Sequence, residues 1–564
     1  MIYAHLIEYP YLRKLMKKSI FLLHIAFILL ADLLSAQSIT VAPAQLNFGV
    51  VTETAPDSQQ VTITNNTGYD VTLTGYRFYT IYGNSPFSTS AGNITIPNGN
   101  SQSIWIKFSP RHNIAHNTEL FILNSGHQGA LRVDLLGQGH YSKTYYNHTE
   151  NLKEEVLKDT LQGIISNNYV NLGYSTGRDS MFMIIDNKKV NGQGASQNTI
   201  ECVYTGRNAV GYIDRTDCQT NFTFNTEHTF PQGFFNSLEP MRADLYHLYP
   251  TDDLANNVRG SLPFGTVTNP SWTSGGSKCN NTTFEPRDVH KGHVARAMLY
   301  FVIRYQNYNN FLNSQEGILR QWHRTFLPDP IEITRAEKIF TMQDNRNPFI
   351  DYPQFEERIT SFSSTSVEGA FASSDTPEDT INFGLVNATI PARYTFWVAN
   401  DGNQVLTMYN MNLTPSTLLS FLNGTGTGTT IQPGEAVPID IELANAAPGT
   451  LQNAFLNFAL SGNGLLANIV VPIEAQLSLT GTEEIPNAYA YTLYPNPATT
   501  ELCIDGSDGI KSNLRIMDMS GRTISTLTGM SDNCYDIRDI QSPGIYILQW
   551  EEQSAVIRKT WIKQ

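Results

Sequence analysis

Apolar and polar residues alternate in short runs between residues 38 and 140. The clearest runs cover residues 39–43, 46–51, 60–65 and 104–108. Turn-forming residues separate them, as in Pro97-Asn98-Gly99-Asn100. Alternation with a period of two is typical of half-buried strands, and several short strands joined by turns predict a β-sandwich.

The pattern changes between residues 141 and 358. Apolar residues recur at helical spacing over residues 152–165, and a stronger helix is predicted over residues 289–305. We expect Asp288 to cap the exposed amides at the start of that second helix. Short apolar runs and long polar loops fill the space between the helices, which predicts a mixed α+β domain.

Strand-like alternation returns after residue 361. Residues 362–482 carry turns rich in Gly and Thr and predict a second β-sandwich. A linker is expected near residues 481–486. Residues 487–564 then predict a small β module of their own.

The N-terminus predicts export. Four basic residues precede an apolar run at residues 20–34, which ends in Ser35-Ala36. This order is typical of a secretory signal, here residues 1–36, and Met16 is an alternative start. The other interpretation is a membrane anchor, but the run is shorter than the roughly 20 residues that a spanning helix needs and it includes His24 and Asp32.

Net charge limits how the chain can meet nucleic acid. The formal charge is −14 at pH 7, which excludes a general basic coat, so any such contact must be local. Of the five cysteines, Cys503 and Cys534 are the expected pair. The other three leave one unpaired, and no spacing fits a structural zinc site.

One cluster has the residue types needed to hydrolyse a phosphodiester. A neutral imidazole can take a proton from water near neutral pH, and a hard divalent cation bound by oxygen ligands can stabilise the phosphate. His228 could be that base, Glu227 beside it could bind the cation, and Asn256 could add an amide ligand from a helix over residues 251–258. One carboxylate and one amide would leave coordination sites free for phosphate oxygens. Taken singly, a Glu-His pair is common and a helical Asn is often a cap.

Two flanking regions resemble known modules. Leu46-Asn47-Phe48-Gly49, Ile63-Thr64-Asn65 and Leu135-Leu136-Gly137-Gln138-Gly139 resemble strands of the immunoglobulin-like modules found beside bacterial exported enzymes. Residues 487–564, with Tyr494-Pro495-Asn496-Pro497 and Met519-Ser520-Gly521-Arg522, resemble the C-terminal sorting domain of the type IX secretion system of Bacteroidetes. This second resemblance implies the type IX machinery as a partner, followed by release or attachment at the cell surface.

Five blocks of the central domain, in order, resemble the endonuclease I family of ββα-metal nucleases. They are Asn225-Thr226-Glu227-His228, Asp244-Leu245-Tyr246-His247-Leu248, Asn256 with Arg259-Gly260, Phe284-Glu285-Pro286 with Lys291-Gly292, and Arg346-Asn347-Pro348-Phe349-Ile350-Asp351. Three positions depart from the family pattern. Thr226 replaces an Arg, Tyr246 a His and His293 an Asp.

The resemblance implies roles for single residues. His228 is the general base, and Glu227 and Asn256 bind Mg²⁺, with Ca²⁺ or Mn²⁺ as alternatives. An arginine near the scissile phosphate is either Arg259, which we favour slightly, or Arg242. Asp244 and His247 are expected to support the site or position substrate, or simply to pack.

The expected architecture is therefore a multidomain chain. It has an α+β nuclease domain at 141–358, immunoglobulin-like sandwiches at 38–140 and 362–482, and the sorting domain at 487–564. The predicted function is a secreted or cell-surface endonuclease that cuts DNA, and also RNA, with little sequence preference. Two alternatives stay open: a catalytically silent surface or matrix-binding protein built on a nuclease core, and a nuclease that uses His247 as its base.

Overall fold

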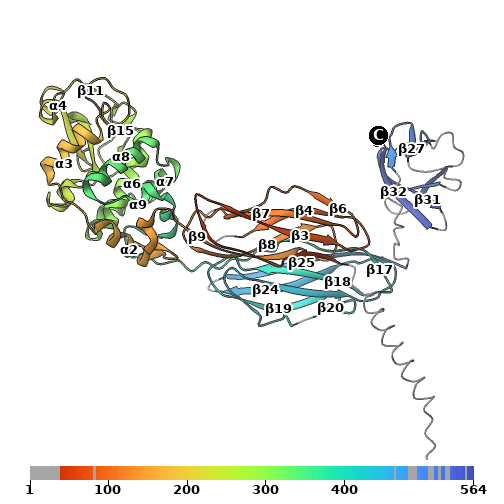
Figure 1. The fold of residues 1–564 in the computed structure, drawn as a ribbon. Coiled ribbons are helices and arrows are strands. Elements are labelled where there is room, and N and C mark those ends of the chain that lie inside the picture. The colour runs from red at the N-terminus through yellow and green to blue at the C-terminus, as the bar shows by residue number, and fades with distance from the viewer. Residues whose placement is uncertain are drawn as a thin grey trace, which may run out of the picture.

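The computed structural model describes residues 38–79, 84–422, 424–462, 465–479, 492–505, 514–518, 522–527, 534–540, 542–552 and 555–563. Within these ranges it shows a helical domain and three β units (Figure 1). The predicted signal peptide and the linker at residues 481–486 lie outside the described residues. Among the described helices, none combines the length and the hydropathy that crossing a bilayer requires.

The first β unit is the predicted sandwich. One sheet has the order β1 (Ile39–Ala42), β3 (Asp57–Asn65), β7 (Ser101–Phe108) and β5 (Phe87–Ser88). The other has the order β2 (Gln45–Thr52), β9 (Leu131–His140), β8 (Ala115–Asn124), β4 (Val71–Phe78) and β6 (Ile94–Ile96). Alternate residues of both sheets point into one core, as the period of two predicts.

The second sandwich begins like the first, with a parallel strand pair that contains a β-bulge. Strands β2 and β17 (Ile381–Asn387) both pair in parallel with the last strand of their sheet, and both registers shift just after an Asn. Gly49 and Gly384 have φ of 63° and 64°, and their amides bond the side chains of Asn47 and Asn382. Because L residues rarely adopt such a φ, glycine is required at both bulges.

The strands of this second sandwich form two sheets. The larger has the order β17, β25 (Leu465–Ser478), β24 (Ala454–Gly462), β19 (Leu406–Thr414) and β21 (Thr430–Ile431), with β23 (Gly449–Thr450) on β25. The smaller has the order β18 (Ala392–Ala399), β22 (Ala436–Leu443) and β20 (Leu419–Phe421). The two sandwiches lie side by side (Figure 1), where the Trp397 indole donates to the Ala130 carbonyl at 3.0 Å.

The last β unit is small and also has two sheets. One contains β26 (Thr492–Tyr494), β27 (Glu501–Asp505) and β30 (Cys534–Asp536). The other contains β29 (Thr523–Leu527), β28 (Leu514–Met517), β31 (Gly544–Glu552) and β32 (Ala555–Lys563). A disulfide joins Cys503 to Cys534 and confirms the expected pair, while Cys202, Cys218 and Cys279 are buried free thiols.

The helical domain is built around one buried helix. Its helices are α2 (Glu154–Ser166), α3 (Tyr174–Ser180), α4 (Arg215–Asn221), α5 (Asp253–Arg259), α6 (Asp288–Arg304), α7 (Glu316–Thr325), α8 (Pro330–Gln343) and α9 (Pro348–Asp351). Helix α6 is buried on nearly all sides after its first turn. The predicted Asp288 cap is wrong, because Arg287 occupies the cap position and the Asp288 carboxylate pairs with Lys291 at 2.7 Å.

Three small sheets complete this domain. They pair β10 (Thr199–Glu201) with β11 (Asn208–Val210), β12 (Phe224–His228) with β13 (Leu248–Asp252), and β14 (Trp272–Ser274) with β15 (Ser277–Cys279) and β16 (Phe284–Glu285). Helix α5 follows β13 directly and packs against β12. The order strand, strand, helix from 224 to 259 carries the candidate site.

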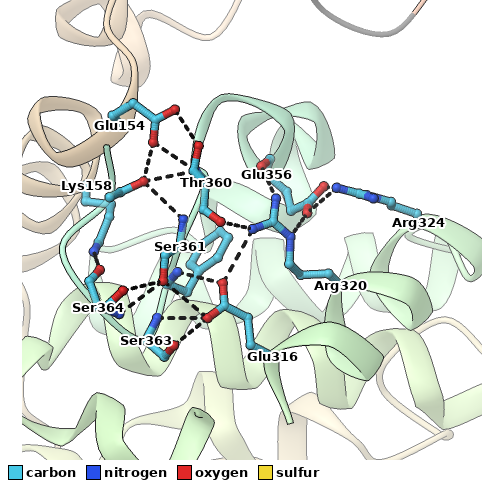
Figure 2. A network of polar contacts seen from close by, with 12 residues as sticks. Glu154, Lys158, Glu316, Arg320, Arg324, Glu356, Thr360, Ser361, Ser363 and Ser364 are labelled. Atoms are coloured by element: carbon cyan, nitrogen blue, oxygen red, sulfur yellow. Dashed lines mark hydrogen bonds and ion pairs between the residues drawn. The ribbon is translucent and has the colours of Figure 1, made fainter. Parts of the chain in front are cut away.

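A polar network fixes the point where the chain leaves this domain (Figure 2). Glu356 is fully buried and bonds both Arg320 and Arg324. Glu316 accepts from the Phe362 amide at 2.8 Å and the Ser363 hydroxyl at 2.6 Å. The chain stays on the helical domain beyond the predicted boundary at residue 358, because Phe362 packs in that domain's core.

Candidate active site

The site lies on the antiparallel hairpin of β12 and β13. Glu227 faces Tyr249 in the register, and His228 faces Leu248. Glu227 is 2 % exposed and His228 5 % exposed. Since neighbours on a strand point to opposite sides, the two side chains diverge from the end of β12, as the sequence predicts.

Glu227 has one oxygen engaged and one free. Its Oε1 accepts from the Tyr204 hydroxyl at 2.7 Å and lies 3.3 Å from Arg259 Nε, without hydrogen-bond geometry. Within the described residues, Oε2 has no hydrogen bond and is not among the fully enclosed orphan atoms. Burial raises the pKa of this carboxyl group, although Arg259 and Tyr204 oppose the rise.

His228 has a tautomer fixed by its surroundings. Its Nε2 lies 3.3 Å from the Arg242 carbonyl, which can only accept, so Nε2 carries the proton. Nδ1 therefore keeps its lone pair, and among the described residues it bonds no partner. Burial, the His247 ring and the Arg242 and Arg178 guanidinium groups lower the pKa of His228 well below its usual range, against the effect of the carbonyl.

Asn256 lies in the middle of α5, and Arg259 of the same helix lies against Glu227. Arg259 follows Asn256 by three residues, so both lie on one face of the helix. The Asn256 side chain is partly exposed and makes no hydrogen bond to any described residue. In contrast, the Asn257 amide donates to Asp253 at 3.2 Å. The half-open Asn256 amide and the free Glu227 oxygen are the kind of oxygen donors that a hard divalent cation prefers, and α5 packs on β12.

The Arg259 side chain is buried and bonds the protein's own backbone. It is 1 % exposed, and its guanidinium donates to the Thr229 carbonyl at 2.7 Å and the Gly260 carbonyl at 2.8 Å. It also lies over the Phe264 ring at 4.6 Å. Its donors are therefore directed at the protein, and it holds α5 to the end of β12.

Arg242 has a different environment. It belongs to η4 (Met241–Ala243), is partly exposed, and makes no ion pair within the described residues. Its guanidinium lies 4.0 Å from the centroid of the Tyr174 ring, and that ring lies 5.5 Å from the His228 ring. Arg242 was predicted from the sequence, but Tyr174 was not. The spacing of Tyr174 and Arg178, one helical turn apart, was the available sign that the two side chains lie together.

Asp244 and His247 are fully buried. Asp244 accepts from Tyr300 at 2.9 Å and from Arg304 at 2.6 Å. Burial would raise the pKa of Asp244, but Arg304, His247 and these hydrogen bonds bring it below its usual value. His247 Nε2 bonds the Met241 carbonyl at 2.6 Å, and its Nδ1 is enclosed without a partner. Both residues thus support the hairpin from inside.

The other acids and aromatic residues of the matching blocks have structural contacts. Glu285 pairs with Lys291 at 2.8 Å, Arg296 pairs with Glu332 at 2.5 Å, and the Tyr246 hydroxyl donates to the Asn345 carbonyl at 3.1 Å. Among the parts of the chain that the structure describes, no group of three His, Cys, Asp or Glu side chains forms a metal site. A cation would therefore depend on a mixed carboxylate and amide set.

Comparison with known families matches three segments of the chain. Residues 153–354 match the family described as Endonuclease I, residues 492–564 a secretion system C-terminal sorting domain, and residues 38–135 a HYDIN/CFA65/VesB-like immunoglobulin-like domain. Two extracellular ribonucleases are similar to the central region. The one from Bacillus subtilis (strain 168) is 28% identical over 234 residues, 38% of this chain and 78% of the relative. The one from Bacillus amyloliquefaciens is 27% identical over 236 residues, 39% of this chain and 78% of the relative.

Proposed function

We propose that this protein is an exported, metal-dependent endonuclease of DNA and RNA with little sequence preference. Residues 153–354 match the Endonuclease I family, residues 492–564 match a secretion system sorting domain, and two extracellular ribonucleases are similar to the central region. One observation carries the proposal. His228 has a fixed tautomer and a free ring nitrogen, the adjacent Glu227 is buried with one free carboxylate oxygen, and α5, which carries the unbonded Asn256 amide, packs on β12.

His228 acts as the general base. The Arg242 carbonyl orients the ring, and Nδ1 is the atom that receives the proton from water. Its surroundings keep the imidazole neutral, which is the state that a base requires. His247 is the weaker candidate, because its only unbonded nitrogen is enclosed.

Glu227 and Asn256 would hold the divalent ion, Mg²⁺ with Ca²⁺ or Mn²⁺ as alternatives. Glu227 offers Oε2 and Asn256 its amide oxygen, while Tyr204 fixes the carboxylate from behind. When bound, such an ion neutralises charge on the phosphate and acidifies water near the leaving oxygen. With two protein ligands the ion keeps room for substrate oxygens.

Arg242 is the arginine that meets the scissile phosphate. The sequence slightly favoured Arg259, but the guanidinium of Arg259 is buried and its hydrogen bonds go to backbone carbonyls. Arg242 is partly exposed beside His228 and has no acid partner among the described residues. We therefore assign Arg259 to the support of Glu227 and α5.

Plasmid nicking tests the proposal. The wild-type protein should nick supercoiled DNA with Mg²⁺ and stop when a chelator is added. His228→Ala should slow nicking by about 10²–10⁴-fold, the usual contribution of a general base. A structured RNA assayed in parallel tests the second substrate, which the names of the two relatives favour.

The control is His247→Gln, which keeps a donor for the Met241 carbonyl. Thermal melting of each variant shows whether it is folded. Absence of nicking by the wild type, or equal nicking by folded His228→Ala, would remove the enzyme and leave the surface-binding alternative. Loss of nicking only in folded His247→Gln would transfer the base role to His247.

A further inference from the structure

Arg178 and Arg242 stand apart from the other arginines of the nuclease domain. Within the described residues of that domain, ten of the other arginines form an ion pair with a carboxylate, and Arg358 donates to Asn113. Arg178 and Arg242 form none there, and the Nε atom of each is enclosed without a hydrogen bond. Two uncompensated cations thus lie in one place on a chain of net charge −14.

Both guanidinium groups share one aromatic ring. The Arg178 guanidinium carbon lies 4.1 Å from the Tyr174 ring centroid, and that of Arg242 lies 4.0 Å from it. The ring itself lies 5.5 Å from the His228 ring. Stacking on an aromatic face fixes a guanidinium plane and leaves its edge N–H groups free to meet an anion.

The backbone holds this stack together. Helix α3 packs directly on the η4 segment through Gly177, where an added Cβ would lie 3.2 Å from the Ala243 carbonyl oxygen. Arg178 follows Gly177, and Arg242 precedes Ala243. Close approach of the two segments therefore places both guanidinium groups on the ring of Tyr174, despite their repulsion.

Two acids lie near the stack, but neither forms an ion pair with Arg178 or Arg242 among the described residues. Asp179 pairs with Arg215 at 2.7 Å, and Glu239 accepts from the Tyr174 amide at 3.0 Å. Burial is the main cause that lowers the pKa of Arg178, and Arg215 and Arg242 lower it further, while Tyr174 and Asp179 oppose the fall. The pair is therefore unfavourable by itself and becomes favourable when an anion arrives.

We propose that Arg178, stacked on Tyr174, binds the backbone phosphate next to the scissile one, while Arg242 meets the scissile phosphate. This rests on the proposed function and adds to it, because the site then recognises a strand with consecutive phosphates and not an isolated phosphodiester. It also explains how an acidic protein binds nucleic acid, through a local clamp of two cations. Arg178 is a substrate-positioning residue with no part in proton transfer.

The test compares two substrates. A dinucleoside monophosphate has one phosphodiester, whereas a single-stranded oligonucleotide has phosphates on both sides of the cut. Arg178→Gln should lower kcat/KM on the oligonucleotide by at least about tenfold more than on the dinucleotide, as for a lost hydrogen bond to a charged group. Arg215→Gln is the matched control, because it removes a nearby cation that is already paired with Asp179.

Two variants of Tyr174 separate positioning from folding. Tyr174→Leu removes the ring and should reproduce the loss seen with Arg178→Gln, whereas Tyr174→Phe keeps the stacking face and should retain activity. An equal fall on both substrates, or no fall on the oligonucleotide, would overturn the clamp. Melting curves that match the wild type show that a loss is not caused by unfolding.

Binding without cleavage makes the clamp testable apart from catalysis. Anisotropy of a labelled oligonucleotide in chelator, measured over a salt series with the full chain, gives the number of phosphates contacted. Arg178→Gln should reduce the slope of log affinity against log salt by about 0.7, the value for one contact on a single strand. An unchanged slope overturns the clamp even if hydrolysis is normal. If the wild type binds and Arg178→Gln lowers the slope as expected, but the wild type cleaves no substrate, the clamp is retained and the proposed enzyme is refuted.

Discussion

At the scale of single residues, two adjacent asparagines on α5 have opposite situations. Asn257 is exposed and bonds Asp253, which is an ordinary contact one turn away along a helix. Asn256 has no such partner among the described residues, although it is partly buried. The Asn256 amide is therefore available to a ligand, whereas the Asn257 amide is occupied.

This difference predicts unequal effects of truncation. Asn256→Ala should raise the Mg²⁺ concentration needed for half-maximal nicking by at least about tenfold, since a metal ligand should count no less than the groups that support it. Stability should be unchanged, because no protein hydrogen bond is lost. The measurement is a Mg²⁺ titration of nicking rates together with a melting curve.

Asn257→Ala is the control for the metal titration. It removes an amide of the same size from the same helix and should keep the wild-type Mg²⁺ dependence. If both variants shift the titration alike, the effect comes from α5 as a whole and Asn256 is not a ligand.

At the scale of elements, Arg259 joins α5 to the end of β12. Its side chain bonds the Thr229 and Gly260 carbonyls and lies against the Glu227 carboxylate. Removal of the guanidinium would leave the buried Glu227 carboxylate without a cation beside it, and would take a hydrogen-bond donor from two carbonyl oxygens. Arg259→Met should therefore cost about 3–5 kcal/mol in the free energy of unfolding of the domain.

Denaturant unfolding measures this cost, and Arg242→Gln is the comparison. The Arg242 variant loses no ion pair within the described residues, so its stability should match the wild type while its activity falls. A stable Arg259→Met protein that has lost only hydrolysis would show that Arg259 meets the substrate, as the sequence slightly favoured.

The main elements could be predicted from the sequence because they repeat. Helices α2 and α6 and the strands β1, β2, β3 and β7 of the first sandwich follow from the spacing of apolar residues. The sequence Asn-Phe-Gly occurs in both sandwiches, at Asn47 and at Asn382. Only the first copy contributed to the predicted resemblance to immunoglobulin-like modules. Period alone does not indicate that a glycine forms a bulge in both.

The site could be predicted only in part. Family blocks located Glu227, His228 and Asn256, and the structure shows that α5 packs on β12. The function of Arg259 could not be foreseen, because burial and carbonyl partners depend on tertiary contacts. Tyr204, which bonds Glu227 at 2.7 Å, lies 23 residues away in a stretch without periodicity. The prediction for Asp288 failed because it relied on residue type alone. Asp often caps a helix, but here its carboxylate pairs with Lys291.

At the scale of the whole molecule, histidines are unevenly distributed among the units. The nuclease domain buries His290 and His323, whereas the sequence of the second sandwich, from residue 381 to 478, has no histidine. His323 Nε2 donates to the Pro353 carbonyl at 2.9 Å. Burial lowers the pKa of His323 to about 4, and burial together with His293 and nearby arginines lowers the pKa of His290 well below 6.5.

These histidines should make the nuclease domain more sensitive to acid than the second sandwich. Unfolded histidine takes up a proton near pH 6.5, but His323 in the folded domain does so only near pH 4. Between these values the unfolded state binds more protons, so stability falls as the pH falls, and above pH 6.5 these groups have no effect. Calorimetry in chelator should show the nuclease transition moving to lower temperature over this range, with a much smaller shift for the second sandwich. His323→Gln, which keeps a donor for Pro353, should reduce the slope. A nuclease transition independent of pH over this window, or the same slope in the variant, would mean that His323 is not the group responsible.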